Sequence, residues 1–151
     1  LGTWALVFLC LTLTMTPLRW ITQQTVWILR RRFLGLTAFS YAVMHLLVWA
    51  WLDNQWVLED MIKDVLKRPY LTFGAAALFL MVPLALTSNR WSIKKLGPRW
   101  GQLHRLVYLI VILGLIHLYF HKAGKHDFAK VWTYGSVVFV LLGFRAWRLT
   151  K

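Results

Sequence analysis

Long apolar stretches without formal charge constrain the fold of this chain more than any other feature. The clearest is Phe33–Leu52 (FLGLTAFSYAVMHLLVWAWL), which contains no acid, lysine or arginine. A helix needs about 20 such residues to cross a bilayer. The sequence therefore predicts an all-α, polytopic transmembrane helix bundle with five spans, in which short connections make successive helices antiparallel. The predicted spans are Thr3–Leu18, Phe33–Leu52, Leu71–Thr87, Leu103–Phe120 and Val131–Trp147.

The composition agrees with a membrane protein and excludes several other classes. Hydrophobic residues make up 59% of the 151 residues, which is too many for a soluble domain of this size. Cys10 is the single cysteine, so neither an intrachain disulfide nor a cysteine-based metal site is possible. The net charge of +13 lies between the spans, which indicates membrane topology rather than nucleic-acid binding. We therefore expect contacts with lipid and none with nucleic acid.

The charged residues divide between alternate connections of the predicted bundle. One group of connections is basic and contains no acid, and the positive-inside rule places it in the cytoplasm. The first, third and fifth spans then run inward. The basic residues of this group are Arg19, Arg30, Arg31, Arg32, Arg90, Lys94, Lys95, Arg99, Arg105, Arg145, Arg148 and Lys151. All five acids lie in the other group, and they are Asp53, Glu59, Asp60, Asp64 and Asp127.

The connection Asp53–Tyr70 has a helical period of its own. Its apolar residues recur at helical spacing, which predicts a short amphipathic helix on the outer membrane face rather than an ordinary surface loop. These residues are Trp56, Val57, Leu58, Met61, Ile62, Val65 and Leu66.

Two histidines lie deep inside predicted spans, where an imidazole is costly unless it has a partner. His45 follows Arg32 at the same distance along the chain as His117 follows His104. At about 1.5 Å per helical residue, both lie about 20 Å from the cytoplasmic edge, in the outer half of the bilayer. Two imidazoles at one height on two helices suit a haem with two axial histidines. The alternative for either ring is a hydrogen bond to a neighbouring carbonyl or hydroxyl.

The other histidines lie near the membrane boundaries. His104 stands beside Arg105 at the cytoplasmic boundary, where a cofactor role and an interfacial or packing role are about equally supported. His121 follows His117 by one helical turn, and like His126 it suits a solvated position at the outer interface better than a metal site. Glycines at Gly35, Gly74 and Gly114 allow close approach of helices or of a porphyrin.

Three segments of the chain resemble the ferric reductase-like transmembrane family. Within it they are most similar to the bacterial haem-binding membrane subunits of periplasmic methionine sulfoxide reductase systems. The segments are RRFLGLTAFSYAVMHLLVW, KRPYLTFGAAALFL and LALTSNRWSIKKLGPRWGQLHRLVYLIVILGLIHLYF. The resemblance implies a six-helix domain in the bacterial inner membrane, with residues 1–151 lacking the first helix.

The resemblance also implies cofactors and partners. The expected cofactors are b-type haem and FMN, and the expected electron donor is a cytoplasmic flavin reductase or quinone. The expected acceptor is a periplasmic molybdopterin subunit that reduces oxidised methionine. The haem histidines of the family correspond to His45, His104 and His117. Two-haem relatives have a further histidine where this chain has Arg31, which favours one haem between His45 and His117 and leaves His104 as a possible ligand.

The sequence thus predicts an electron-transfer subunit of an oxidoreductase system rather than a stand-alone catalyst. Two neutral axial histidines leave no open iron position, which favours electron transfer over oxygen chemistry. No acid lies inside any predicted span, which disfavours proton transport along carboxylates. The alternatives are a two-haem ferric reductase, a quinol-oxidising cytochrome b and a haem-free membrane anchor.

Overall fold

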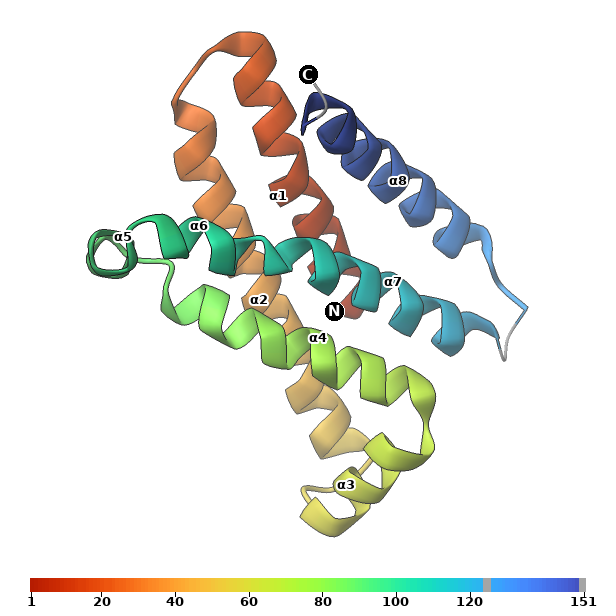
Figure 1. Cartoon of the computed structure of the whole chain (residues 1–151). Coiled ribbons are helices and arrows are strands. Elements are labelled where there is room, and N and C mark those ends of the chain that lie inside the picture. The colour runs from red at the N-terminus through yellow and green to blue at the C-terminus, as the bar shows by residue number, and fades with distance from the viewer. Residues whose placement is uncertain (124–125, 150–151) are drawn as a thin grey trace.

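The chain folds into helices joined by short turns (Figure 1). The computed structural model describes residues 1–123 and 126–149, and no strand occurs among them. The predicted all-α class is therefore confirmed. The helices are α1 (Gly2–Thr22), α2 (Val26–Leu52), α3 (Leu58–Lys67), α4 (Pro69–Leu86), α5 (Arg90–Leu96), α6 (Pro98–His104), α7 (Leu106–Ala123) and α8 (Ala129–Leu149).

Four stretches of the described chain are long and apolar enough to cross a membrane. They are α1, α2, α4 and the segment Pro98–Ala123, in which α6 and α7 follow each other with a break at Arg105. Helix α8 has 21 residues and covers the fifth predicted span, but it is not one of the four. Its lower hydropathy follows from Lys130, Arg145 and Arg148. Five long helical segments thus coincide with the five predicted spans, but only four of them are long and apolar enough to be candidate spans.

The helices pack as two antiparallel pairs with α8 at one side. Helix α1 lies along α2, and α4 lies along α7, as Figure 1 shows. Helix α8 contacts α7 and α1. The largest of the completely buried side chains, Leu13, Ile110 and Val111, come from α1 and α7, and Ala38 of α2 is buried as completely. The core therefore lies where α1, α2 and α7 meet.

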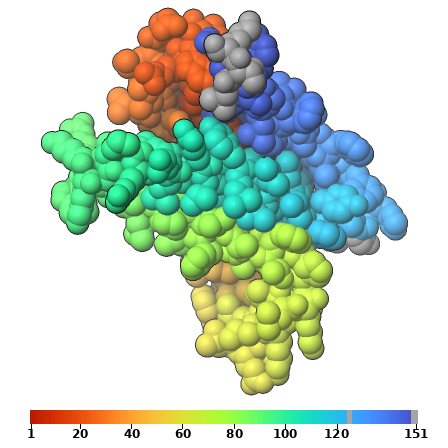
Figure 2. Space-filling model, in the orientation of Figure 1, coloured from red at the N-terminus to blue at the C-terminus, as the bar shows by residue number. Residues whose placement is uncertain are grey.

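The outer surface of the bundle is apolar, as a lipid-facing surface must be. The most exposed large side chains include Phe139 at 79%, Phe79 at 77% and Trp132 at 77%. Helix α3, yellow in Figure 2, projects beyond the band that α4 and α7 form. The amphipathic helix predicted within Asp53–Tyr70 is confirmed as α3, although Trp56 and Val57 precede it. Trp56 has a left-handed backbone, with φ of 64°, which a helix does not contain.

Two short helices, α5 and α6, occupy a connection for which the sequence predicted no helix. Asn89 caps α5, because its side-chain oxygen accepts a hydrogen bond of 2.7 Å from the Ser92 amide. Gly97 then turns the chain with φ of 51° and ψ of −126°, a backbone conformation that favours glycine. This turn directs α6 back toward the bundle and brings Trp100 and His104 against the end of α4.

A proline in α1 explains how α8 is attached. Pro17 has no amide proton, so the carbonyl of Leu13, four residues earlier, lacks its helical donor. The Nη2 atom of Arg145 donates to this carbonyl at 2.9 Å. A side chain of α8 thus completes the hydrogen bonding of α1, which fixes the position of α8 against the bundle.

Candidate cofactor site

His45 of α2 and His117 of α7 meet in space, as their predicted equal height required. Their ring centroids lie 6.3 Å apart and their planes are inclined at 77°. His117 is partly buried, whereas His45 is exposed at the surface of the bundle. An exposed imidazole within an apolar span is costly unless another group covers it. The pair is therefore a candidate ligand site.

The hydrogen bonding of His117 determines which of its nitrogens can bind a metal. Its Nδ1 atom lies 2.6 Å from the carbonyl oxygen of Tyr70. A carbonyl only accepts hydrogen bonds, so Nδ1 carries the proton and donates it. The Nε2 atom of the neutral ring then has a free lone pair. Metal-binding histidines are typically oriented in this way, through a carbonyl or carboxylate at the other nitrogen.

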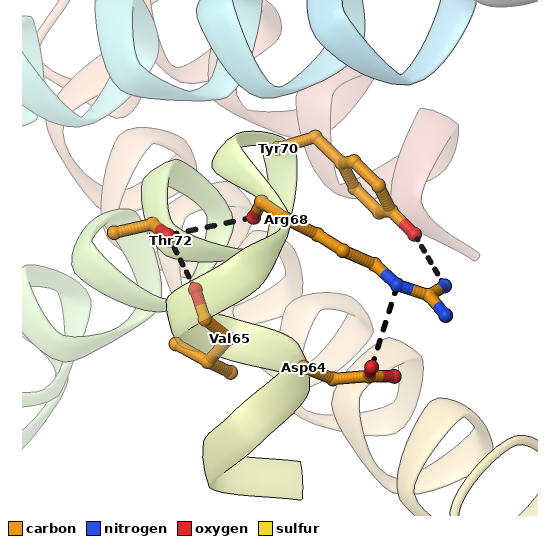
Figure 3. A network of polar contacts seen from close by, with 5 residues as sticks. All are labelled: Asp64, Val65, Arg68, Tyr70 and Thr72. Carbon is orange, nitrogen blue, oxygen red and sulfur yellow. Dashed lines mark hydrogen bonds and ion pairs between the residues drawn. The ribbon is translucent and has the colours of Figure 1, made fainter.

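The backbone around Tyr70 is held by the polar network shown in Figure 3. Thr72 donates from its hydroxyl to the carbonyls of Val65 and Arg68, which ties the start of α4 to the end of α3. Arg68 donates to the Tyr70 hydroxyl at 3.2 Å and pairs with Asp64 at 3.4 Å. The junction of α3 and α4 thereby fixes the carbonyl that orients His117.

Glycines stand against both imidazoles. A Cβ atom at Gly74, one turn after Tyr70 on α4, would lie 2.7 Å from Nδ1 of His117. A Cβ atom at Gly2 would lie 2.9 Å from Nε2 of His45. Both distances are shorter than non-bonded contact allows, so any side chain at either position would displace a ring. At Gly35 and Gly114 a Cβ atom would make only ordinary contacts of 3.8 and 3.7 Å.

His121 extends the same cluster toward the surface. Its ring stacks on His117 with an interplanar angle of 9° and a centroid distance of 6.3 Å, and it lies 5.5 Å from the Tyr70 ring. His121 is exposed, as is His126. Within residues 1–123 and 126–149 no group of three or more His, Cys, Asp or Glu side chains is placed to hold a metal ion. Two axial nitrogens instead suit a metal whose other positions a macrocycle fills.

His104 lies apart from the pair, at the other end of the bundle. Its Nε2 atom lies 3.1 Å from the Thr87 hydroxyl, which itself donates to the Pro83 carbonyl at 2.6 Å. Since the Thr87 proton is used, Nε2 of His104 is the donor and its Nδ1 has the free lone pair. Trp100 stacks on the ring with a centroid distance of 4.0 Å. This ring is thus held by packing and by one hydrogen bond.

A cavity of about 440 Å³ lies beside His104 in the same end of the bundle. Apolar side chains line most of it, among them Leu9, Phe39 and Val107. Arg31 lines it as well and lies near His104. The equal spacing of His45 from Arg32 and of His117 from His104 places Arg32 and His104 at one height, and both line this cavity.

Several contacts of the two histidine regions were not predicted from the sequence. The Tyr70 carbonyl, Gly2 and Thr87 lie far along the chain from the rings that they contact, whereas Trp100 lies one helical turn before His104. The close contact of Gly74 with His117 did have a sequence signal, since a glycine within a span allows close approach. A backbone acceptor leaves no signal at all, because every residue has one.

The fold and the histidine arrangement define a class of protein, an integral-membrane helix bundle with paired intramembrane histidines. The family model of the ferric reductase like transmembrane component matches residues 1–115, so the chain belongs to this family. Its curated relatives give a finer likeness. The heme-binding subunit MsrQ of a protein-methionine-sulfoxide reductase from Ralstonia nicotianae is 51% identical over 148 residues, covering 97% of this chain and 68% of the relative.

Other relatives carry the same name. The MsrQ subunit of Herminiimonas arsenicoxydans is 48% identical over 152 residues, covering 97% of this chain and 69% of the relative. That of Agrobacterium fabrum is 49% identical over 145 residues, covering 96% and 66%. No solved structure matches the chain. The resemblance inferred from the three sequence segments is therefore confirmed.

Proposed function

We propose that this chain is the haem-binding electron-transfer subunit of a methionine sulfoxide reductase system, with His45 and His117 as axial ligands of one b-type haem. The observation that carries the proposal is the meeting of these two rings, 6.3 Å apart, from helices that are far apart in sequence. The names of the relatives support it, because each is a heme-binding subunit of such a reductase.

The distance between the rings fits a metal shared by both. A metal–imidazole bond is about 2 Å long and a ring nitrogen lies about 1 Å from its centroid, so axial rings have centroids roughly 6 Å apart. The Nδ1 bond of His117 leaves Nε2 as its free ligand atom. Gly74 and Gly2 let the two imidazoles pack directly against α4 and α1. The residues present therefore fit a haem.

The bound haem would supply a one-electron carrier, and the chain would set its position and its redox potential. His45 and His117 would hold the iron, and with both imidazoles bound no position would remain for a small-molecule ligand. The Tyr70 carbonyl holds the proton of His117 on Nδ1 and makes the ring a stronger ligand. These roles suit electron transfer better than catalysis at the iron.

The direction of transfer follows from the charge asymmetry. We infer that the acid-free end faces the cytoplasm, that the membrane is the bacterial inner membrane, and that the donor is a flavin reductase or quinone there, with FMN as an associated cofactor. The acceptor would be the periplasmic molybdopterin subunit, docked near α3. We also infer that residues 1–151 form one domain, since Arg145 of α8 completes α1.

His104 supports a second candidate function. The cavity beside it is large enough for a cofactor, so a two-haem reductase or a quinol-oxidising cytochrome b remains the alternative. Release of His104 from Thr87 would be needed before its Nε2 atom could bind a metal. Haem stoichiometry on the purified protein separates these functions from the one-haem proposal.

Substitution of single histidines tests the ligand assignment. His45→Ala and His117→Ala should each abolish or strongly deplete the b-type signal in reduced-minus-oxidised spectra. His121→Ala is the matched control, because it removes an imidazole from the same cluster without removing a proposed ligand. Equal haem loading in the three variants would refute the assignment. A wild-type protein without a b-type spectrum would support the haem-free anchor.

A further inference from the structure

A cavity of about 360 Å³ lies between the turn that follows α2 and the polar face of α3, at the end of the bundle where Figure 1 shows α3. The turn contributes Asp53 and Asn54 to its wall. Helix α3 contributes four charged residues at helical spacing, which therefore share one face of the helix. These residues are Asp60, Lys63, Asp64 and Lys67. Both signs of charge thus line one small space.

Asn54 is the buried polar residue of this cavity. It is 7% exposed, and its Nδ2 atom is buried without a hydrogen-bond partner among residues 1–123 and 126–149. An amide donor in this state has lost its contacts with water and gained none in return, which is unfavourable. Buried polar groups of native proteins are almost always paired, so the state of Asn54 indicates that a bound group supplies the missing acceptor.

The charges of α3 that face the cavity are arranged in like pairs. Asp60 and Asp64 lie one helical turn apart, and so do Lys63 and Lys67. Like charges at this spacing destabilise a helix. A ligand with a positive and a negative group would offset both repulsions at once.

Three charged groups of the wall, those of Asp53, Asp60 and Lys67, take part in none of the ion pairs formed within the described part of the chain. A metal ion does not suit them, because no three His, Cys, Asp or Glu side chains of residues 1–123 and 126–149 are placed to hold one. The cavity therefore offers two unpaired carboxylates, one unpaired ammonium and one amide donor to a larger, zwitterionic ligand.

The depth of the cavity indicates the source of such a ligand. At about 1.5 Å per helical residue, Phe33–Leu52 extends about 30 Å, which is the thickness of the hydrocarbon core of a bilayer. Asp53 follows directly, so the cavity lies at the level of the lipid headgroups. Trp51 and Leu52, just before it, are 63% and 65% exposed and present an apolar surface to acyl chains. A tryptophan at this level is typical of a membrane boundary.

We propose that this cavity binds the headgroup of one phosphatidylethanolamine molecule, with its ammonium at Asp53 and Asp60. Its phosphate lies at Asn54 and Lys67, where it accepts from the amide and pairs with the ammonium. Half a turn of the Asn54 amide exchanges Nδ2 with Oδ1, two atoms of similar size, so the donor can reach the ligand. The primary ammonium of the lipid donates three hydrogen bonds, which a trimethylated one cannot. The site is independent of the proposed haem ligands.

Native mass spectrometry of the purified full-length protein tests the site in an equimolar mixture of phosphatidylethanolamine, phosphatidylcholine and phosphatidylglycerol. The wild type should retain phosphatidylethanolamine in at least about fivefold excess over either competitor, because only its headgroup combines a hydrogen-bonding cation with a phosphate. Asp60→Asn, at an exposed position, should abolish this excess. Asp127→Asn is the matched control, since Asp127 is an exposed acid that pairs with Lys122 outside the cavity.

Two results of this experiment would overturn the proposal. One is equal retention of the three lipids by the wild type. The other is an undiminished excess in Asp60→Asn. If Asp60→Asn instead weakened the binding of a soluble protein partner while lipid retention stayed the same, the cavity would be a protein-docking site and the proposal would be wrong.

A thermal measurement tests the role of Asn54. Addition of phosphatidylethanolamine to phosphatidylcholine nanodiscs should raise the thermal midpoint of the wild type by several degrees, and it should not raise that of Asn54→Leu, which lacks the donor. If Asn54→Leu does not fold, the wild type is compared in phosphatidylethanolamine and its N-methyl and N,N-dimethyl derivatives. Each methyl group removes one donor, so the rise should decrease stepwise. The same rise with all three lipids would contradict the site.

Discussion

The two ends of the bundle stabilise their charges in different ways. At the end that carries α3, acids and bases form ion pairs on the surface. Lys63 pairs with Glu59 at 2.6 Å, and Lys122 pairs with Asp127 at 2.8 Å. Arg68 pairs with Asp64 in the network of Figure 3. Such exposed pairs contribute little stability, but they give Lys63, Arg68 and Lys122 a local acid as partner.

The opposite end has cations and no acids, and its cations contact aromatic rings instead. The guanidinium carbon of Arg30 lies 5.0 Å from the Trp27 ring, and Nζ of Lys95 lies 4.5 Å from the Trp91 ring. Arg148 and Arg145 contact Trp20 and Tyr108 in the same way. The positive-inside rule favours cations at this end of the bundle. Because no acid lies there, uncharged aromatic side chains stabilise these cations. Arg145 is the position at which they do not suffice, because its Nε and Nη1 atoms are buried and have no hydrogen-bond partner among the described residues.

The largest expected effect concerns the close packing of the histidine pair. Gly74→Ala would place a Cβ atom 2.7 Å from Nδ1 of His117, displace the ring and break its bond to Tyr70. We expect at least a loss of about fivefold in haem affinity, since overpacking costs about 1–3 kcal/mol. Gly101→Ala at the other end is the control, because a Cβ atom there meets nothing within 4 Å. Haem titration followed by absorbance measures both, and equal affinities would disprove the packing argument.

The next effect concerns the attachment of α8 to α1. Arg145→Met leaves the Leu13 carbonyl without a donor, because Pro17 cannot supply one. Pro17→Ala restores a helical donor, so Arg145→Met should cost about 1 kcal/mol less in that background. Unfolding of the four proteins of this double-mutant cycle in detergent measures the coupling. A coupling energy of zero would mean that the bond to Leu13 contributes nothing to stability.

A smaller effect is expected at His104. Thr87→Val removes the hydroxyl that accepts from His104 and donates to Pro83, and we expect a loss of about 1 kcal/mol of stability. The b-type spectrum of the His45–His117 site should not change, because His104 lies at the other end of the bundle. Thermal unfolding and the reduced-minus-oxidised spectrum are recorded on the same sample. A changed spectrum would show that His104 contributes to the haem site.

The smallest effect concerns the ion pair that closes the connection between α7 and α8. The hydrogen bond from Lys122, followed by its charge, lowers the pKa of Asp127. Because the pKa is lower in the folded state, this stabilisation is present above the ordinary aspartate value of about 3.9 and is lost as the pH falls through the folded pKa. Lys122→Met should raise the pKa of Asp127, which carboxyl NMR measures. An unchanged pKa would show that the pair does not form in solution.

Much of the fold follows from local sequence properties. The spans, the amphipathic helix α3 and the separation of acids from bases depend on periodicity and on residue type, and the structure contains α3 and four of the five predicted spans. Helices α5 and α6 were missed because each has seven residues, too few to show a period. Their positions depend on the Asn89 cap and the Gly97 turn, which are recognisable only once the ends of α5 are known.

The sequence by itself determined that His45 and His117 lie at one height in an apolar bundle, because helical rise and hydrophobicity are properties of single segments. Only the tertiary structure decided that the Tyr70 carbonyl orients His117 and that Arg145 replaces the donor missing at Pro17. These contacts join residues far apart in the chain, and a backbone carbonyl has no identity that a sequence pattern could display. The proton position on His117 and the unbalanced charge of Arg145 are therefore properties of packing rather than of composition.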